Sequence, residues 1–180
     1  MQSTRDQLFS LFFALVLGCA ALPAVADDAC VDFKWDVSKE RALFAETPAK
    51  VTAGRDPRSA PGVVPNRLYL LGLMAQDTVA FSANPAKEAA STPAYAGLAT
   101  LKAPAAGSYR VAVDQPLWID VVADGALVQP KDFQGQRGCS APRKIVEFDL
   151  VGGQPVVLQF SNAVKDRILL TVTPSPPRKL

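Results

Sequence analysis

Two acidic residues in the C-terminal half of the chain have the spacing of an acid/base pair. Glu147 and Asp149 alternate with apolar residues in the run 144–151, so we expect both side chains on one face of a strand. Many glycosidases use two carboxyl groups about 5–10 Å apart, one of them as a general acid. A solvent-exposed strand face has the same pattern, so a carboxylate-dependent hydrolase is one of two alternatives to the function favoured below.

A second pair combines an aromatic ring with a carboxylate. Trp118 and Asp120 alternate with three aliphatic residues, Leu117, Ile119 and Val121. If the aliphatic residues face the core, the tryptophan projects outward beside the acid. An aromatic face next to a hydrogen-bonding group is typical of modules that bind sugar rings. Trp118 and Asp120 are therefore candidate binding residues, and burial of Trp118 beneath a loop or helix is the alternative.

The segment 131–144 is basic. Arg143 and Lys144, together with Lys131 and Arg137, are offset only by Asp132. Such a segment can attract an anionic polymer or a phosphate-bearing surface. Arg143 and Lys144 are therefore further binding candidates, and a hydrated loop anchored by a nearby cysteine is the alternative.

The chain contains no histidine. This excludes Ser-His-Asp and Cys-His catalysis and histidine-ligated zinc, copper and iron sites. Four acids near the N-terminus, Asp27, Asp28, Asp32 and Asp36, have a spacing that matches no calcium loop. We therefore expect no metal, no cofactor and no enzymatic activity. The net charge of +2 is too small to indicate a nucleic-acid partner.

Residues 1–26 have the pattern of an export signal. Arg5 precedes the apolar run 8–17, and Ala24-Val25-Ala26 forms a small-x-small cleavage site. The run is shorter than the roughly 20 residues that span a bilayer. We expect cleavage after Ala26 and a periplasmic or secreted protein. The alternative is a lipoprotein, lipidated at Cys19 and held at a membrane.

Two cysteines remain after cleavage, Cys30 and Cys139. In an oxidising compartment an isolated pair favours a disulfide. The bond would pin the N-terminal segment to the loop that precedes the run 144–151.

One helix is predicted, over residues 33–46. Asp36 or Ser38 can cap its first turn. Its apolar side consists of Trp35, Val37, Leu43 and Phe44, and its exposed side of Lys39, Glu40 and Arg41. Residues 47–66 are rich in proline and are expected to form an irregular connection.

From residue 67 onward the pattern changes to short β-prone runs separated by turns. The predicted strands are Arg67–Met74, Thr78–Ser82, Tyr95–Lys102, Ser108–Asp114, Leu117–Ala123, Lys144–Val151, Pro155–Ser161 and Arg167–Thr173. Asp124-Gly125 and Gly152-Gly153 have the sequences of hairpin turns. We expect a mostly β fold, an antiparallel two-sheet sandwich of jelly-roll type over 67–173, with a disordered tail at 174–180. A lipocalin-like barrel is the alternative.

Four strand segments carry a resemblance: 106–113, 118–121, 157–163 and 167–172. They look like the strands of bacterial prepeptidase-C-terminal-type domains, which are small jelly-roll modules of secreted proteins. The resemblance spans residues 67–173 and rests on strand and turn patterns. It implies a non-catalytic module and supplies no catalytic residue.

The start of the mature chain carries a second resemblance. Cys30, Phe33, Trp35 and Asp36 are similar to the start of small uncharacterised exported proteobacterial proteins, some of which bear a homogentisate dioxygenase label. Such iron enzymes bind their metal through histidine, which this chain lacks.

The function predicted from the sequence is that of an exported, non-catalytic binding or accessory module of the cell envelope. Its expected partner is a glycan or another envelope protein, and contact with a membrane is expected only if Cys19 is lipidated. The alternatives are the carboxylate-dependent hydrolase and a structural or inhibitor-like partner of another exported protein.

Overall fold

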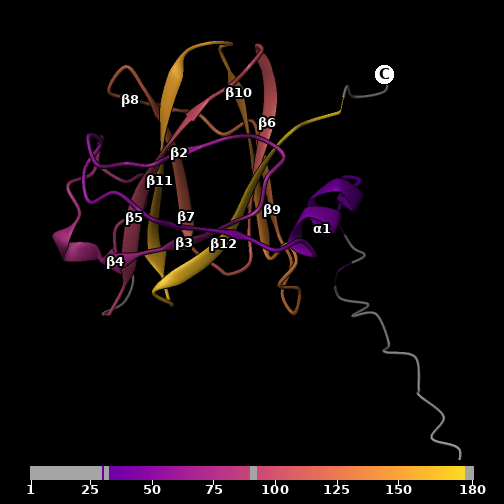
Figure 1. Cartoon of the computed structure of the whole chain (residues 1–180), viewed down its shortest axis with the longest axis horizontal. Helices are drawn as coiled ribbons and strands as arrows, with labels where there is room; N and C mark the ends of the chain where they lie inside the picture. The colour runs from indigo at the N-terminus through magenta and orange to yellow at the C-terminus, as the bar shows by residue number, and fades with distance from the viewer. Residues whose placement is uncertain (1–29, 31–32, 90–92, 177–180) are drawn as a thin grey trace, which may run out of the picture.

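The protein is a two-sheet β-sandwich with one short helix (Figure 1), seen in a computed structural model that describes Cys30, residues 33–89 and residues 93–176. Sheet A has the strand order β1-β3-β12-β6-β10-β9, and sheet B has the order β2-β5-β11-β7-β8, with β4 also paired to β5. The elements are α1 (Ser38–Phe44), β1 (Ala49–Thr52), β2 (Gly62–Val63), β3 (Tyr69–Gly72), β4 (Met74–Ala75), η2 (Gln76–Thr78), β5 (Tyr95–Lys102), β6 (Gly107–Val113), β7 (Trp118–Ala123), β8 (Ala126–Val128), β9 (Asp132–Gly135), β10 (Lys144–Leu150), β11 (Pro155–Ala163) and β12 (Arg167–Pro174).

The core between the sheets comes from the alternating strands that the sequence predicts. Phe148, Phe160, Leu158 and Leu170 are among its fully buried side chains. Each comes from a strand whose next residue points to the opposite, outer face of its sheet. The mostly β, sandwich-like prediction is confirmed.

The sheets are mixed and not purely antiparallel. β1 pairs with β3 in parallel, and β2 pairs with β5 in parallel. Both short strands lie in the segment 47–66, so the prediction of an irregular connection there is wrong at these two places. Each strand gains its hydrogen bonds at the edge of a sheet that the rest of the chain has built, which local sequence does not report.

Three further local predictions are wrong. Residues 78–82 form no strand, and η2 ends at Thr78. β9 lies in the segment before the run 144–151, where the sequence predicts a loop. The Gly152-Gly153 turn connects β10 of sheet A to β11 of sheet B, so it crosses between layers and forms no hairpin. There the backbone of Ala106 approaches so closely that a Cβ at Gly152 would lie 2.6 Å from the Ala106 amide nitrogen.

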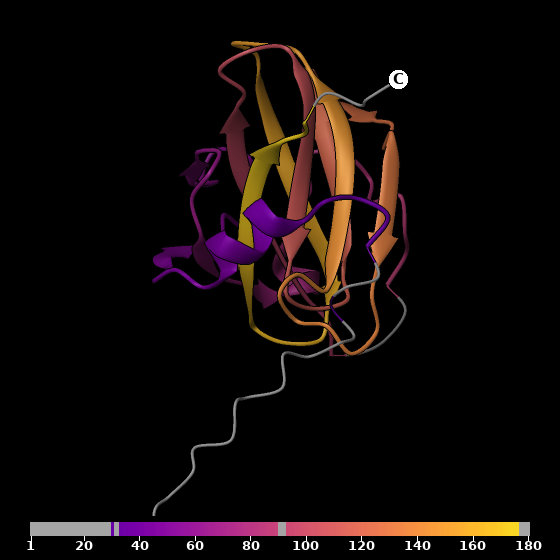
Figure 2. The ribbon, with the colours of Figure 1, turned by 90° about the vertical axis from the view of Figure 1, so that its right-hand side faces the viewer.

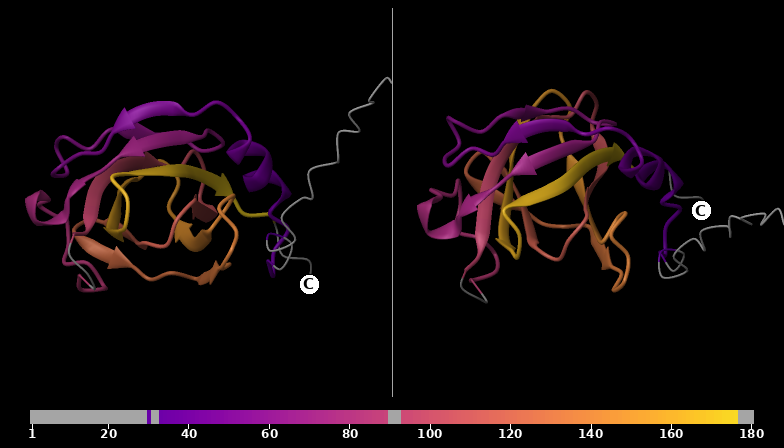
Figure 3. Two further views of the ribbon diagram at one scale, coloured as in Figure 1. Left: turned by 90° about the horizontal axis from the view of Figure 1, so that it is seen from below. Right: turned by 60° about the horizontal axis from the view of Figure 1, so that its bottom comes forward.

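Helix α1 lies across the outer face of sheet A (Figure 2) and beside the end of β12 (Figure 3). Val37 packs on Ala112 and Ile145, and Phe33, Trp35 and Phe44 lie around this contact. The helix is shorter than predicted. The Ser38 amide donates to Asp36 Oδ1 at 2.9 Å. This bond from Ser38, with a favourable charge from Arg110, holds the pKa of Asp36 below its usual value.

The prediction of an exposed Glu40 is wrong, since only 2% of this residue is accessible. The α1 face that was expected to be hydrated turns toward sheet A. Partners for the carboxylate come from strands far away in the sequence.

The predicted disulfide is present. Cys30 and Cys139 are bonded, with their Cα atoms 5.1 Å apart. The bond ties the segment before α1 to the loop before β10. Residues 1–26, including Cys19, lie outside the described residues, and so do residues 177–180 of the tail. Among the described residues, no helix is long and apolar enough to cross a membrane.

Candidate functional site

The outer face of sheet B carries a square of four side chains from β7 and β11. In register, Trp118 lies opposite Ser161, and Asp120 lies opposite Gln159. Their strand neighbours Ile119 and Phe160 point into the core. The square therefore faces away from the core, as the sequence predicted for Trp118 and Asp120. We call these four residues the sheet-B floor.

Three predicted binding residues meet at the floor. Trp118 and Asp120 belong to it, and Lys144 reaches it from β10 of sheet A. The Trp118 indole nitrogen donates to Asp120 Oδ1 at 2.9 Å. The Lys144 ammonium lies 4.8 Å from the centre of the Trp118 ring and donates to the carbonyl of Leu117 at 2.8 Å. Trp118 is half-buried, and Asp120 is buried. The Trp118 side chain is therefore fixed at its indole N–H and has the Lys144 ammonium over its ring.

Burial changes the ionisation of both charged residues here. Burial raises the pKa of Asp120, although its hydrogen bonds from Trp118 and Ala86 and the charge of Lys144 oppose the rise. Burial lowers the pKa of Lys144, and Asp120 opposes this fall. The two groups thus stabilise each other's charged form in a region that disfavours charge.

A loop segment, Ala83–Glu88, covers the floor, and we call it the strap. The side-chain amide of Gln159 makes two bonds to Ala83: it accepts from the amide at 3.0 Å and donates to the carbonyl at 3.2 Å. Asp120 Oδ2 accepts from the amide of Ala86 at 3.2 Å. Asn162 donates to the carbonyl of Glu88 at 3.1 Å. The strap is therefore attached to sheet B through side-chain-to-backbone hydrogen bonds.

The basic residues of the segment 131–144 have separate contacts. Lys144 turns toward Trp118, while Lys131 pairs with Asp149 at 3.0 Å. Arg143 is half-buried, its amide donates to the carbonyl of Val113 at 2.7 Å, and Arg137 is exposed. The structure thus brings Lys144, but not Lys131, to the floor.

Glu147 and Asp149 lie on the outer face of sheet A but in different surroundings. Glu147 is 2% accessible, whereas the side chain of Asp149 is 64% accessible. The interpretation of the pair as one hydrated face is therefore wrong for Glu147. The reason is α1, which covers sheet A at Glu147. Asp149 lies beyond the covered area and stays exposed to solvent.

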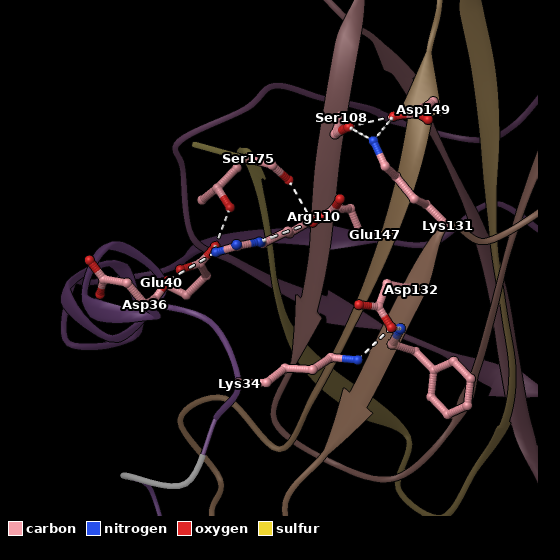
Figure 4. Close-up of polar contacts among 12 residues, drawn as sticks. Lys34, Asp36, Glu40, Ser108, Arg110, Lys131, Asp132, Glu147, Asp149 and Ser175 are labelled. Atoms are coloured by element: carbon pink, nitrogen blue, oxygen red, sulfur yellow. Dashed lines mark hydrogen bonds and ion pairs between the residues drawn. The ribbon is translucent and has the colours of Figure 1, made fainter. Parts of the chain in front are cut away.

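Arg110 joins the buried acids beneath α1 (Figure 4). Its guanidinium lies 3.5 Å from Glu147 Oε2 and 3.6 Å from Glu40 Oε1, and it donates to the carbonyl of Asp36 at 2.9 Å. The ring of Trp35 covers it, with 5.0 Å from the guanidinium carbon to the ring centre. We call Glu40, Arg110 and Glu147 the sheet-A triad. A cation fixed between two acids keeps both in ion pairs, so the triad is suited to holding α1 in place.

Two hydroxyl groups add hydrogen bonds to the triad, while Glu40 Oε2 has no hydrogen-bond partner among the described residues. Thr173 donates to Glu40 Oε1 at 2.5 Å, and Ser175 donates to Glu147 Oε2 at 3.1 Å. The sequence patterns did not indicate a buried polar role for Arg110 or Thr173. The available signal was a charged residue in the middle of an otherwise apolar strand, because such a charge needs a buried partner.

A serine and a lysine meet at the exposed end of the same face. Ser108 donates to Asp149, and the Lys131 ammonium donates to Ser108 Oγ at 2.7 Å. Ser-Lys catalysis requires a neutral lysine that can accept the serine proton. Here Lys131 is partly exposed and forms an ion pair with Asp149 at 3.0 Å, and the Ser108 hydroxyl donates to Asp149 and not to the lysine. This group is therefore a surface polar contact.

The described residues contain no group of three or more side chains suited to hold a metal ion. A hollow of about 910 Å³ lies beside the strap, with apolar walls from Phe81, Pro85 and Pro93 and charged groups from Asp77 and Glu88. Its lining also includes Ala89, and we assign no ligand to it. Neither Glu147 nor Asp149 lines it.

Neither sequence resemblance identifies a family, since no protein-family model matches the chain and no curated protein matches it. The fold and the site therefore define a mostly β two-sheet protein with one disulfide and a half-exposed tryptophan on the outer face of sheet B.

Proposed function

We propose that this chain is an exported, non-catalytic module of the cell envelope that binds a carbohydrate at the sheet-B floor. The observation that carries the proposal is the arrangement of Trp118. Its indole N–H is fixed by the buried Asp120, the residue as a whole is only half-buried, and the Lys144 ammonium lies over its ring. A preoriented ring beside hydrogen-bonding groups favours a sugar, which presents C–H groups on one face and hydroxyls at its rim.

The contacts of the acidic pair support the non-catalytic part of the proposal. A glycosidase needs two acids facing a substrate cleft, with one pKa raised. Glu147 is enclosed by Arg110 and Ser175, and Asp149 is paired with Lys131. The hydrolase stays an alternative that these contacts do not favour.

Two features support export. The disulfide between Cys30 and Cys139 is consistent with an oxidising location outside the cytoplasm. The N-terminal signal pattern, with cleavage after Ala26, has the same implication. The prepeptidase-C-terminal-type resemblance adds an expectation of a secreted accessory module, because the fold is a sandwich of the same general kind.

The test is tryptophan fluorescence during titration with maltohexaose, cellohexaose and chitohexaose. The chain has two tryptophans, so the protein is used as Trp35→Phe to isolate the signal of Trp118. We expect saturable quenching by at least one hexasaccharide, and calorimetry should detect the same binding. Trp118→Ala in the chain that retains Trp35 should abolish the calorimetric signal. The absence of any binding across the three sugars would contradict the proposal.

A protein partner is the second candidate, and the edge strand β9 favours it. Phe133 in this strand is 64% exposed, and β9 is the last strand of sheet A, paired with β10 in the part of the chain that the structure describes. An exposed edge strand can accept an extended segment of another chain. A photocrosslinker at position 133 should then capture an envelope protein, and the same group at the exposed Val164 serves as control. Equal labelling from both positions would contradict this second candidate.

A further inference from the structure

The strap and the sugar would compete for the same polar groups of the floor. We infer that the strap Ala83–Glu88 is a gate over the carbohydrate site, and that ligand binding requires it to leave the floor. The inference rests on the proposed function, and it assigns Gln159 and Ser161 to the site beside Trp118 and Asp120. It makes the strap an internal competitor whose backbone occupies positions that sugar hydroxyls take in the complex.

The strap is attached to the floor by few contacts and buries little apolar surface. Asn84, Ala86, Lys87 and Glu88 are exposed, and Ala83 and Pro85 are partly exposed. None of the six is part of the buried core. Segments that bury little apolar surface open locally at a small fraction of the global unfolding free energy. The described contacts that hold the strap are hydrogen bonds to Asp120, Gln159 and Asn162.

The hydrogen bonds that hold the strap are of the kind that a sugar can form. Gln159 uses its amide as donor and acceptor to Ala83, and Asp120 accepts from Ala86. A vicinal diol of a sugar also offers a donor and an acceptor to one side-chain amide, and a hydroxyl donates to a carboxylate in the same way. The strap thus satisfies the groups of the floor that a saccharide would satisfy.

The floor also contains a hydroxyl group without a hydrogen-bond partner in the described part of the chain. Ser161 is 1% accessible, and its Oγ has no hydrogen-bond partner among the described residues. A buried hydroxyl without a partner is unfavourable in a closed structure. Ser161 lies opposite Trp118 in the register. A sugar stacked at the ring would have a hydroxyl group within the reach of this residue, so the closed strap leaves unsatisfied a group that the ligand can satisfy.

The consequence is a measurable coupling. If only the open form binds, the observed Kd equals the intrinsic Kd divided by the open fraction. Weakening the strap without changing the floor should therefore strengthen binding. Ala86→Pro removes the amide that donates to Asp120, and Ala86→Ser is the matched control that keeps this amide.

The experiment titrates the disulfide-intact protein with the three hexasaccharides by calorimetry. Since the observed Kd falls as the open fraction rises, Ala86→Pro should bind about tenfold or more tightly than the wild type. Ala86→Ser should match the wild type. Ser161→Ala should weaken binding severalfold, with little change in the midpoint of urea unfolding.

Hydrogen exchange supplies a second readout. Saturating hexasaccharide should accelerate amide exchange in the peptide that contains Ala83–Glu88, because the ligand holds the strap open. Slower exchange there on binding would overturn the gate, since the sugar would then rest on the closed strap.

The outcomes separate the two proposals. Binding by the wild type with an unchanged Kd in Ala86→Pro refutes the gate and leaves the carbohydrate function in place. Binding by both proteins, with the tighter Kd in Ala86→Pro, supports both. An absence of binding in both proteins refutes the carbohydrate function and, with it, the gate.

Discussion

The two outer faces of the sandwich are both covered by segments that belong to neither sheet, but they are held in different ways. On sheet A, α1 is fixed by the buried triad of Glu40, Arg110 and Glu147 and by the nearby disulfide. On sheet B, the strap is fixed by hydrogen bonds between its backbone and the side chains of Gln159, Asp120 and Asn162. One cover is bound by charge and a covalent bond, the other by groups that a ligand can replace.

This difference separates an anchor from a gate. Breaking a buried ion pair leaves a desolvated charge, which is strongly destabilising. Exchanging one hydrogen-bond partner for another changes the free energy little, because the polar groups stay satisfied. We therefore expect the cover of sheet A to be permanent and the cover of sheet B to be exchangeable. The following predictions test that contrast, from the largest expected effect to the smallest.

Removing the disulfide should have the largest effect. Cys30 and Cys139 are 109 residues apart, and a loop of about this length contributes roughly 4–5 kcal/mol in the chain-entropy model. The double substitution Cys30→Ser/Cys139→Ser should lower the free energy of unfolding in urea by that order. Hydrogen exchange should accelerate in α1 and stay unchanged in the strap. Equal acceleration in both covers would contradict the contrast.

Arg110→Met should be nearly as damaging. It leaves Glu40 and Glu147 buried without their cation, which we expect to cost about 3–5 kcal/mol in urea unfolding. Arg110→Lys keeps a charge but loses the planar fork, and should be intermediate. The control is Lys131→Met in the exposed pair with Asp149, for which we expect about 1 kcal/mol or less. A similar loss in both methionine variants would show that the triad is not an anchor.

Gln159→Leu should have a smaller and local effect. The substitution removes both bonds to Ala83 and should lower the free energy of unfolding by about 1–3 kcal/mol. Amide exchange should accelerate in the strap and not in α1. The exposed Gln129→Leu is the control. Faster exchange in α1 would mean that the two covers are coupled, which the comparison does not predict.

The pH dependence of Asp120 should give the smallest effect. Its folded-state pKa lies above the ordinary value, mainly because of burial. The folded state therefore binds the proton more tightly than the unfolded state, so this group's contribution is full below the unfolded pKa and is lost as the pH rises through the folded pKa. We expect the stability of the wild type relative to Asp120→Asn to fall as the pH rises through that interval, measured by urea unfolding.

The control for the pH series is Asp124→Asn in the exposed β7–β8 turn. Its stability relative to the wild type should vary less with pH than that of Asp120→Asn. A stability difference between wild type and Asp120→Asn that rises with pH would contradict the sign predicted here.

Much of the fold could be predicted from local pattern. The alternating runs around Val111, Phe148 and Leu158 are strands of the core, because a period of two places every second side chain on one face. The Asp124-Gly125 turn joins β7 and β8, with positive φ at both residues. The strands β1 and β2 were missed, since their formation depends on pairing to a neighbour 20 or more residues along the chain. β9 was missed although its partner β10 follows only 9–15 residues later.

The candidate site was predictable in part. The alternation of Trp118 and Asp120 correctly indicated one outward face beside a core face. The roles of Gln159 and Ser161 were not predictable, because a polar residue on an outer face is ordinary until a loop covers it. The strap that covers them is distant in the chain, since Ala83 lies 76 residues before its partner Gln159, and no local pattern connects the two.

By itself the sequence determined the class of fold, the cysteine pair and the direction in which Trp118 and Asp120 point, because these follow from local periodicity and composition. The tertiary structure alone decided that Glu40 is buried against Arg110, that Glu147 and Asp149 have separate surroundings, and that a strap covers the sheet-B floor. The physical reason is that a buried polar group is defined by its partners. For these residues the partners come from distant segments that meet only in the folded chain.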